Sequence, residues 1–286
     1  TERIIADLAQ GVRPWLKPWS AQESGHLITR PLRYNGDPYK GVNVLLLWGA
    51  ATDKGFSSPF WMTYKQAQEL GGQVRKGETG SLVVYANRFT KTETNEEGED
   101  IEREIPFLKG YTVFNTDQID GLPERFQSVP LPSPAPELLH QAAESFFAST
   151  GASFRHGGNR AFYTTAGDFI QMPPPQAFKD PESYAAVKAH ELIHWTGHSS
   201  RMAREFGKRF GDNAYAFEEL VAELGAAFLC ADLQLTPVPR PDHAAYLASW
   251  LKVLRQDKRA IFAAAAHAQR AADYLHGLQA SEKVAA

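Results

Sequence analysis

The sequence predicts an α+β protein of two domains, an N-terminal domain of mixed helices and strands and a C-terminal domain that is mostly helical with a small β-sheet. Three observations predict this class. Strand-like and helix-like segments alternate over residues 1–128, five prolines fall within residues 121–136, and long helical patterns dominate residues 137–286. Because closely spaced prolines continue neither a helix nor a central strand, residues 129–136 are expected to link the two domains.

Composition limits the classes of protein that the chain can belong to. It has 286 residues, 43% of them hydrophobic, which suffices for one large core or two moderate ones. With a net charge of only −3, the chain has no strong overall electrostatic field that would indicate a nucleic-acid or membrane partner. Cys230, the single cysteine, excludes an internal disulfide. No segment approaches the roughly 18 apolar residues that span a bilayer, and the N-terminus lacks a signal peptide's apolar core, so we expect a cytoplasmic protein without a membrane partner.

The first predicted helix ends at Gly11, and an aromatic, proline-containing segment follows it. Two prolines and two tryptophans within residues 13–19 exclude an ordinary helix. Trp15 and Trp19, with Lys17 and an arginine interleaved, offer what a single-stranded nucleic-acid site needs, which is ring faces for bases and cations for phosphates. The alternative, favoured for either tryptophan taken alone, is that the ring attaches the helix to the core.

Further helices and strands are expected in the N-terminal half. The apolar residues 42–48 form either a buried strand or a helix, because so short a run has no decisive period. Thr63 is a good N-cap for a helix over residues 64–70. Strands are expected at residues 81–88 and at about residues 107–115.

An acidic exposed loop, residues 91–104, is expected between these two strands. Residues 1–128 hold 15 Lys and Arg against 17 Asp and Glu, and residues 93–104 contribute seven of the acids and one arginine. The remainder has 14 basic against 10 acidic residues, a balance of +4. The N-terminal half is therefore predicted to have a modest basic surface outside the acidic segment.

The C-terminal half is predicted to begin with a helix over residues 137–149, followed by a hairpin. Residues 161–164 and 168–172 resemble two strands around a turn at Ala166 and Gly167. The hairpin is the candidate for a small sheet whose edge strand can pair with an extended peptide. The last fifty residues have apolar side chains at three- and four-residue intervals, which indicates packed helices.

A metal-binding pattern follows the hairpin. His190, Glu191 and His194 form His-Glu-x-x-His in an alanine-rich run without Pro or Gly until Gly197, so a helix is expected. Residues four apart lie on one helix face, so both imidazoles face one point, and Glu191 would lie beside an open coordination position of Zn²⁺. A chance pattern is disfavoured, because apolar neighbours would bury two histidines without a ligand.

The third ligand is expected on a second helix. A metzincin is disfavoured, because that class needs a histidine six residues after His194, and here the nearest one is His198. Glu219 with Glu223 one turn later resembles the Glu-x-x-x-Asp pattern of thermolysin-like peptidases. There the first carboxylate binds the metal and the second holds a ligand histidine's other ring N–H. Glu218 and His198 remain alternative third ligands.

The predicted ligands imply zinc-dependent peptide hydrolysis, although Mn²⁺ or Co²⁺ suits the same side chains. The metal would lower the pKa of a water toward about 7, and Glu191 would take the proton and pass it to the leaving amine. Tyr215 or His198 remain alternatives for stabilising the oxyanion, and the sequence does not choose between them.

Several long segments carry a family resemblance that extends over nearly the whole chain, namely residues 15–19, 38–43, 61–67, 71–78, 190–198 and 215–223. Through them the sequence resembles the ArdC-like antirestriction proteins of conjugative plasmids, whose N-terminal region also occurs in plasmid-encoded primases. The resemblance implies an N-terminal domain that binds single-stranded DNA and a zincin-like metallopeptidase domain, in a cytoplasmic protein that helps incoming DNA escape restriction.

The implied DNA contacts are expected among aromatic and basic residues of the N-terminal half. Base stacking contributes about 1–3 kcal/mol per base and needs no strongly basic pI. The candidate contacts are Trp15, Lys17, Trp19, Arg33, Tyr34, Tyr39, Lys40, Lys65, Arg75 and Lys76.

Three kinds of function remain open at this point. They are a DNA-binding protein with a competent peptidase that acts on a protein substrate, a DNA-binding protector with a structural or inactive zinc site, and an intracellular peptidase without a DNA function. Glu191 favours the first over the second, because a purely structural zinc site does not need it.

Overall fold

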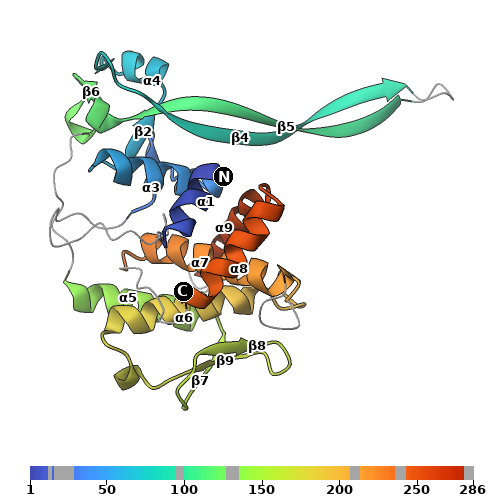
Figure 1. Ribbon diagram of the computed structural model, residues 1–286. Helices are drawn as coiled ribbons and strands as arrows, with labels where there is room; N and C mark the ends of the chain where they lie inside the picture. The colour runs from blue at the N-terminus through green and yellow to red at the C-terminus, as the bar shows by residue number, and fades with distance from the viewer. Residues whose placement is uncertain are drawn as a thin grey trace, which may run out of the picture. The chain divides into compact units, whose positions relative to one another are not determined.

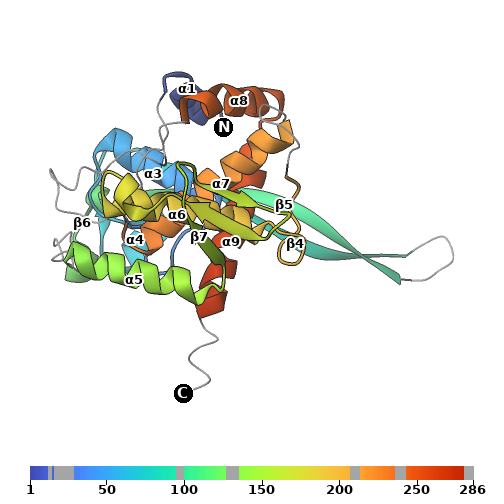
Figure 2. The same cartoon turned by 90° about the horizontal axis from the view of Figure 1, so that it is seen from below.

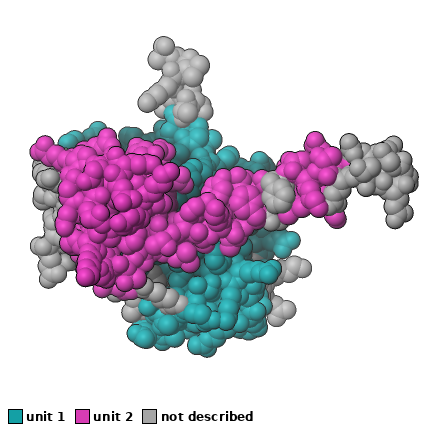
Figure 3. All heavy atoms as spheres, turned by 90° about the horizontal axis from the view of Figure 1, so that it is seen from above, with its two compact units in different colours: residues 1–30, 40–52, 129–286 teal, residues 31–39, 53–128 magenta. Residues whose placement is uncertain are grey.

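The computed structural model describes residues 1–11, 15, 29–94, 100–126, 135–206, 213–235 and 243–279. They form two compact units, each assembled from segments that are separate in the sequence (Figure 3). Unit 1 comprises residues 1–30, 40–52 and 129–286, and unit 2 comprises residues 31–39 and 53–128. Both helices and sheets are present, which confirms the predicted α+β class.

Unit 2 contains a four-stranded sheet, two strands of which continue as a long twisted hairpin (Figure 1). The strand order is β1 (Leu32–Arg33), β2 (Phe60–Met62), β5 (Asp100–Asn115) and β4 (Ser81–Thr94). β1 and β2 are parallel, and the other neighbours are antiparallel. The hairpin strands extend through much of the predicted acidic loop, because the β-branched threonines of residues 90–94 favour extended backbone.

Helix α4 (Tyr64–Glu69) begins at the predicted cap. The Thr63 side chain accepts a hydrogen bond from the Gln66 backbone N–H, and the Gln66 side chain accepts one from the Thr63 N–H. This reciprocal capping box satisfies two donors of the first turn. Nearby, β3 (Gln73–Val74) pairs with β6 (Ile119–Asp120), and the 3₁₀ turns η1 (Thr116–Gln118) and η2 (Glu124–Phe126) flank β6. The core of this region consists of Met62, Ala67, Val74, Ile119 and Phe126.

Unit 1 is a group of helices around α7 (Asn213–Asp232), in which every residue from Glu218 to Ala231 is buried. Around α7 lie α6 (Pro181–Thr196), α8 (His243–Gln256) and α9 (Ala260–Gln279). Helix α5 (Pro136–Ser149) packs against α6, and α1 (Glu2–Ala9) packs against α8. A helix that is apolar on all sides is expected at the centre of such a layer.

The apolar residues 42–48, which the sequence left open between strand and helix, lie in α3 (Val42–Lys54). Most of α3 belongs to unit 1, where the Trp48 ring lies 6.1 Å from the Phe228 ring of α7. A helix forms here because it buries side chains on several of its sides. Val44, Leu45 and Leu47 are among them.

Two further N-terminal residues complete the core of unit 1. Arg30 donates to both carboxylate oxygens of Asp232 at 2.7 Å and to Gln269 at 2.6 Å. The Trp15 ring lies 6.1 Å from that of Trp250. The structural units therefore do not follow the linear division into residues 1–128 and 137–286, because helices from both sides of the proline-rich segment share one core.

A three-stranded sheet lies beside α6 (Figure 2). Its order is β7 (Ser153–His156), β9 (Phe169–Met172) and β8 (Phe162–Thr164), so β8 forms an edge. β8 and β9 are the predicted hairpin, and β7 adds a parallel strand that was not predicted. The 3₁₀ turn η3 (Pro175–Ala177) leads on to α6. None of the helices in the described parts of the chain has the length and apolarity that a membrane crossing requires.

Candidate metal centre

Helix α6 holds His190 and His194 in place. Asp180 caps its first turn by accepting the Ser183 backbone N–H at 2.7 Å, and Pro181 occupies the first helical position, where no donor is needed. The helix continues to Thr196, and every residue from Lys188 onward is buried. The two histidines are therefore presented from a rigid element.

Helix α7 brings Glu219 opposite the histidines. At Gly225 a Cβ atom would lie within 2.9–3.0 Å of three carbon atoms of the Ile193 side chain, so α6 and α7 approach closely there. The absence of a side chain at this position lets carboxylates of α7 reach the imidazoles of α6.

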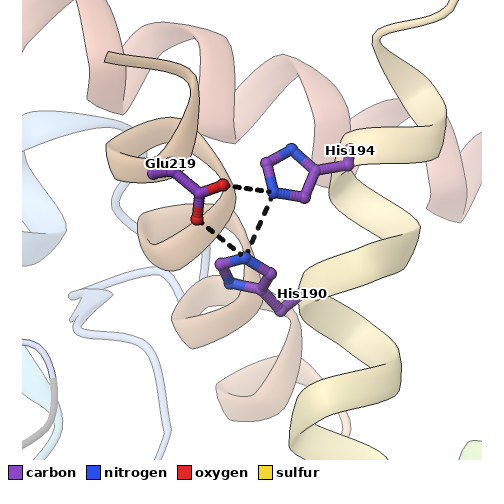
Figure 4. Close-up of side chains that lie close together, drawn as sticks. All are labelled: His190, His194 and Glu219. Carbon is purple, nitrogen blue, oxygen red and sulfur yellow. Dashed lines mark hydrogen bonds and ion pairs between the residues drawn. The ribbon is translucent and has the colours of Figure 1, made fainter. Parts of the chain in front are cut away.

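The donor groups of three side chains converge between the two helices (Figure 4). The Nε2 atoms of His190 and His194 are 3.2 Å apart, and the carboxylate oxygens of Glu219 lie 3.4 Å and 3.5 Å from them. Two ligands at 2.0–2.1 Å from a tetrahedral ion are about 3.3–3.4 Å apart. The spacing and the chemistry of the donors therefore fit one divalent cation, and His190, His194 and Glu219 would hold it.

Glu218 orients His194 from the other side of the ring. Its Oε1 atom accepts a hydrogen bond from His194 Nδ1 at 3.1 Å, so in the neutral imidazole the lone pair lies on Nε2, which faces His190. Arg204 in turn donates to both oxygens of Glu218, at 2.8 Å and 2.9 Å. This buried chain fixes the tautomer that a metal ligand needs.

Glu223, the residue predicted to hold a ligand histidine, lies near the other imidazole. Its Oε2 atom is 3.8 Å from His190 Nδ1, too far for a hydrogen bond, and Nδ1 has no hydrogen-bond partner among the described residues. The other carboxylate oxygen, Oε1, accepts a hydrogen bond from Trp15 Nε1 at 3.4 Å. The orienting hydrogen bond thus comes from Glu218, which was predicted only as an alternative ligand. Both adjacent glutamates reach His194 because its two ring nitrogens face different sides.

Opposing effects set the pKa values in this cluster. Burial lowers the pKa of His194, but the carboxylates of Glu219 and Glu218 outweigh it and raise the pKa to about 10. Burial raises the pKa of Glu219, but the two imidazoles outweigh it and hold the pKa far below its ordinary value. The cluster favours a positive charge between these groups, and a divalent cation would supply that charge in place of a proton.

A cavity of about 400 Å³ opens beside the cluster. Glu191, His194 and Glu219 line it, and Glu191 is only 2% exposed. Phe162 and Tyr163 of the edge strand β8 also line the cavity, and so does Tyr215. The same cavity is therefore lined by the expected general base, by two of the expected ligands and by the edge strand.

Two families match the chain. The zincin-like metallopeptidases match residues 141–267, and the N-terminal domain of the anti-restriction factor ArdC matches residues 1–114. The metal-free crystal structure of the antirestriction ArdC protein from plasmid R388 is 48% identical, with a TM-score of 0.80 over 98% of this chain and 96% of that one. The chain belongs to the ArdC-like antirestriction family.

Further matches also cover nearly the whole of this chain. The Mn(II)-bound structure of the R388 protein is 47% identical, with a TM-score of 0.77 over 97% of this chain and 95% of that one. The protein y4eC of Sinorhizobium fredii is 43% identical over 98% of this chain and 91% of its own length. DNA primase TraC of Escherichia coli is 38% identical over 96% of this chain, but the match covers only 26% of the primase. The resemblance inferred from sequence is confirmed.

Two of the predicted DNA contacts are buried. Trp15 is 3% exposed, and Tyr39 is 7% exposed beneath the Arg33 guanidinium, 5.3 Å from the ring centre. Neither ring offers a face on which a base could stack, so for Trp15 the structure corrects the prediction in favour of the core alternative. The reason is the pairing of Trp15 with Trp250 and Glu223. Lys17 and Trp19 lie outside the described residues.

The remaining predicted contacts are at least partly exposed. Lys40 forms an ion pair with Asp273 at 3.1 Å. Arg75 is held within unit 2 by Glu78 and Asp120, at 3.0 Å and 3.3 Å. The others are well exposed, and they are Arg33, Tyr34, Lys65 and Lys76.

Proposed function

We propose that this ArdC-like protein binds single-stranded DNA and hydrolyses peptide bonds at a zinc site, and that it acts in the cytoplasm to protect DNA arriving by conjugation. The observation that carries the enzymatic part is the convergence of three side chains, each pair of which has donor atoms 3.2–3.5 Å apart, beside a cavity lined by Glu191. A structural site has no need of a buried carboxylate at that position.

The chemistry follows from where the side chains lie. When bound, the cation supplies Lewis-acid activation of water and of a peptide carbonyl. Glu191, adjacent to His190 on α6, would take a proton from the attacking water and deliver it to the leaving amine. β8 would pair with the backbone of an extended peptide, because it is the edge of its sheet. Glu218 and Arg204 would keep His194 oriented throughout.

The DNA-binding part is supported by the match of residues 1–114 to the N-terminal domain of ArdC. It is also supported by exposed aromatic and basic side chains in unit 2, among them Tyr34, which is 39% exposed, and Lys65 and Lys76. Such residues bind single strands without a strongly basic overall charge.

The test compares the zinc-loaded wild type with Glu191→Gln. Metal content is measured together with cleavage of an unfolded protein such as casein, and anisotropy reports binding of single-stranded and duplex oligonucleotides. We expect both proteins to hold one metal ion and to prefer the single strand, and only the wild type to cleave. Equal cleavage by both proteins would refute the role of Glu191. DNA binding and metal occupancy without cleavage would favour the protector with an inactive site.

A further inference from the structure

We propose that one face of the β4–β5 hairpin is the surface on which single-stranded DNA lies. This inference rests on the proposed DNA-binding function and assigns it a location that the sequence did not predict. The face is formed by the odd-numbered residues of β4 and their cross-strand partners, and we call it the aromatic face. Its contact residues are Tyr85, Lys91, Arg103, Phe107, Lys109 and Tyr111.

The pairing register shows that these residues share a face. Directly opposite residues of antiparallel strands project to the same side, and so do alternate residues along each strand. Tyr111 faces Val83, Tyr85 faces Lys109, and Phe107 faces Asn87. Lys91 and Arg103 form a pair farther along the hairpin. The listed residues therefore follow one side of the ribbon, which extends well beyond β2 (Figure 1).

Three successive cross-strand pairs each contribute one aromatic ring. Tyr111, Tyr85 and Phe107 alternate between the strands, and successive pairs on one face are about 6.8 Å apart. The three rings are 39%, 46% and 36% exposed, respectively. Rings that are partly supported and partly open can accept bases, since stacking needs one ring face and no base-specific hydrogen bond.

Polar groups contact these rings from the same side. Lys109 Nζ lies 5.2 Å from the centre of the Tyr111 ring, and Asn87 donates to the Tyr85 hydroxyl at 2.6 Å. The Tyr85 and Phe107 rings are 6.1 Å apart. Each ring is thus near a neighbour that limits its motion, which reduces the entropy lost when a base stacks on it.

The charges separate between the two faces of the hairpin. By the pairing register, the aromatic face has three basic positions, Lys91, Arg103 and Lys109, and one acidic position, Glu93. The opposite face holds Glu102 and Glu104, and its cation Arg88 is paired with Glu104 at 3.1 Å. Basic positions therefore outnumber acidic ones on the aromatic face, and acidic positions outnumber basic ones on the opposite face. Charge complementarity favours a polyanion on the aromatic face.

Cross-strand aromatic contacts also stabilise hairpins, so the test must separate binding from folding. Tyr85→Ile combined with Phe107→Ile removes two rings and keeps apolar side chains with high strand propensity. The matched control is Leu82→Thr with Leu108→Thr, because these leucines are 60% and 61% exposed and lie on the opposite face. Circular dichroism and thermal unfolding establish that both variants fold.

Affinity for a labelled oligothymidine of about 20 nucleotides is measured by anisotropy. Stacking of about 1–3 kcal/mol per base corresponds to an affinity loss of about 5- to 150-fold per ring. We expect such a loss in the folded ring variant and unchanged affinity in the control. Lys91→Gln with Lys109→Gln should also reduce the slope of log K against log salt by about 0.7 per cation, whereas Arg88→Gln should leave it unchanged.

The outcomes distinguish this inference from the function on which it rests. If the wild type binds the oligonucleotide and the folded ring variant binds it equally tightly, the aromatic face is not the DNA site, although the protein still binds DNA. A protein partner for this face would give that result. If the wild type does not bind single strands, both proposals are wrong.

Discussion

At the residue scale, the two adjacent glutamates of α7 have different tasks. Glu219 faces the Nε2 atoms of both histidines. Glu218 accepts a hydrogen bond from His194 Nδ1 and another from Arg204. The sequence predicted Glu219 from its spacing relative to Glu223. It did not predict the task of Glu218, because that depends on how the imidazole is turned and on an arginine from a loop.

Replacing Glu218 tests the orienting role. Glu218→Gln should lower the affinity for zinc about 10- to 100-fold and leave the stoichiometry at one, because loss of an orienting partner weakens a metal site without removing a ligand. Competition with a chromophoric chelator measures the affinity. Glu137→Gln, at an exposed position at the start of α5, is the control. An unchanged zinc affinity in Glu218→Gln would contradict the assignment.

Replacing Glu219 tests the ligand itself. Glu219→Ala should lose bound metal during gel filtration, because two imidazoles alone hold the ion weakly, whereas Glu223→Gln should retain it. Elemental analysis of both proteins provides the measurement. Full occupancy in Glu219→Ala would show that another group completes the site.

At the scale of the elements, the close approach of α6 and α7 depends on Gly225. Gly225→Ala places a methyl group within 3.0 Å of Ile193, so we expect a loss of about 1–3 kcal/mol in unfolding free energy and weaker metal binding. Gly277→Ala in α9 is the matched control, since a Cβ there has nothing within 4 Å. That change should stabilise the protein by up to about 1 kcal/mol. Chemical denaturation compares the two, and equal stabilities would argue against a tight helix contact.

Asp168 joins the β8–β9 hairpin to the segment after α6. It accepts hydrogen bonds from Tyr163 at 2.9 Å and from Arg201, which also lies 3.9 Å from the centre of the Trp195 ring. The Arg201 guanidinium holds the pKa of Asp168 below its ordinary value. A lowered folded-state pKa means that the unfolded chain binds the proton more readily. The stability from this contact is therefore complete above the unfolded pKa of about 4 and is lost as the pH falls through the folded pKa.

Asp168→Asn isolates this contact, because asparagine tolerates the positive φ of 46°. We expect a loss of about 1 kcal/mol at pH 7, kept small because the carboxylate is partly exposed, and a smaller difference from the wild type near pH 3. Denaturant unfolding at both pH values measures it. A difference that grows as the pH falls would contradict the sign.

The sequence predicted elements whose signals are local. The capping residues Thr63 and Gln66 predict α4, and the alanine-rich run around His190 predicts α6. It could not decide that residues 42–48 are helical, because their partners on α7 are distant in the chain. The strands predicted from the sequence were also shorter than β4 and β5, because the charged residues of an exposed two-stranded ribbon resemble those of a loop. Long-range packing and pairing register lie outside the information in a local pattern.

At the scale of the whole molecule, unit 1 needs residues from the beginning of the chain. A fragment of residues 129–286 lacks Arg30, Trp15 and Trp48, which pack against or bind residues of α7, α8 and α9. We expect this fragment to unfold at a lower temperature than unit 1 of the full chain and to bind zinc more weakly. Calorimetry with and without zinc provides the comparison. A fragment as stable as the full chain would show that these contacts contribute little.

The interleaving of segments in unit 1 also bears on inheritance. A recombination breakpoint at the proline-rich segment would give a gene product whose C-terminal half must pack against residues from a different parent, so hybrids of diverged parents would fold poorly. Selection should then keep the two halves together as one genetic block. The primase TraC illustrates such a block, since a region matching 96% of this chain occupies 26% of that protein. A metal site that depends on both halves of the chain would then be inherited whole.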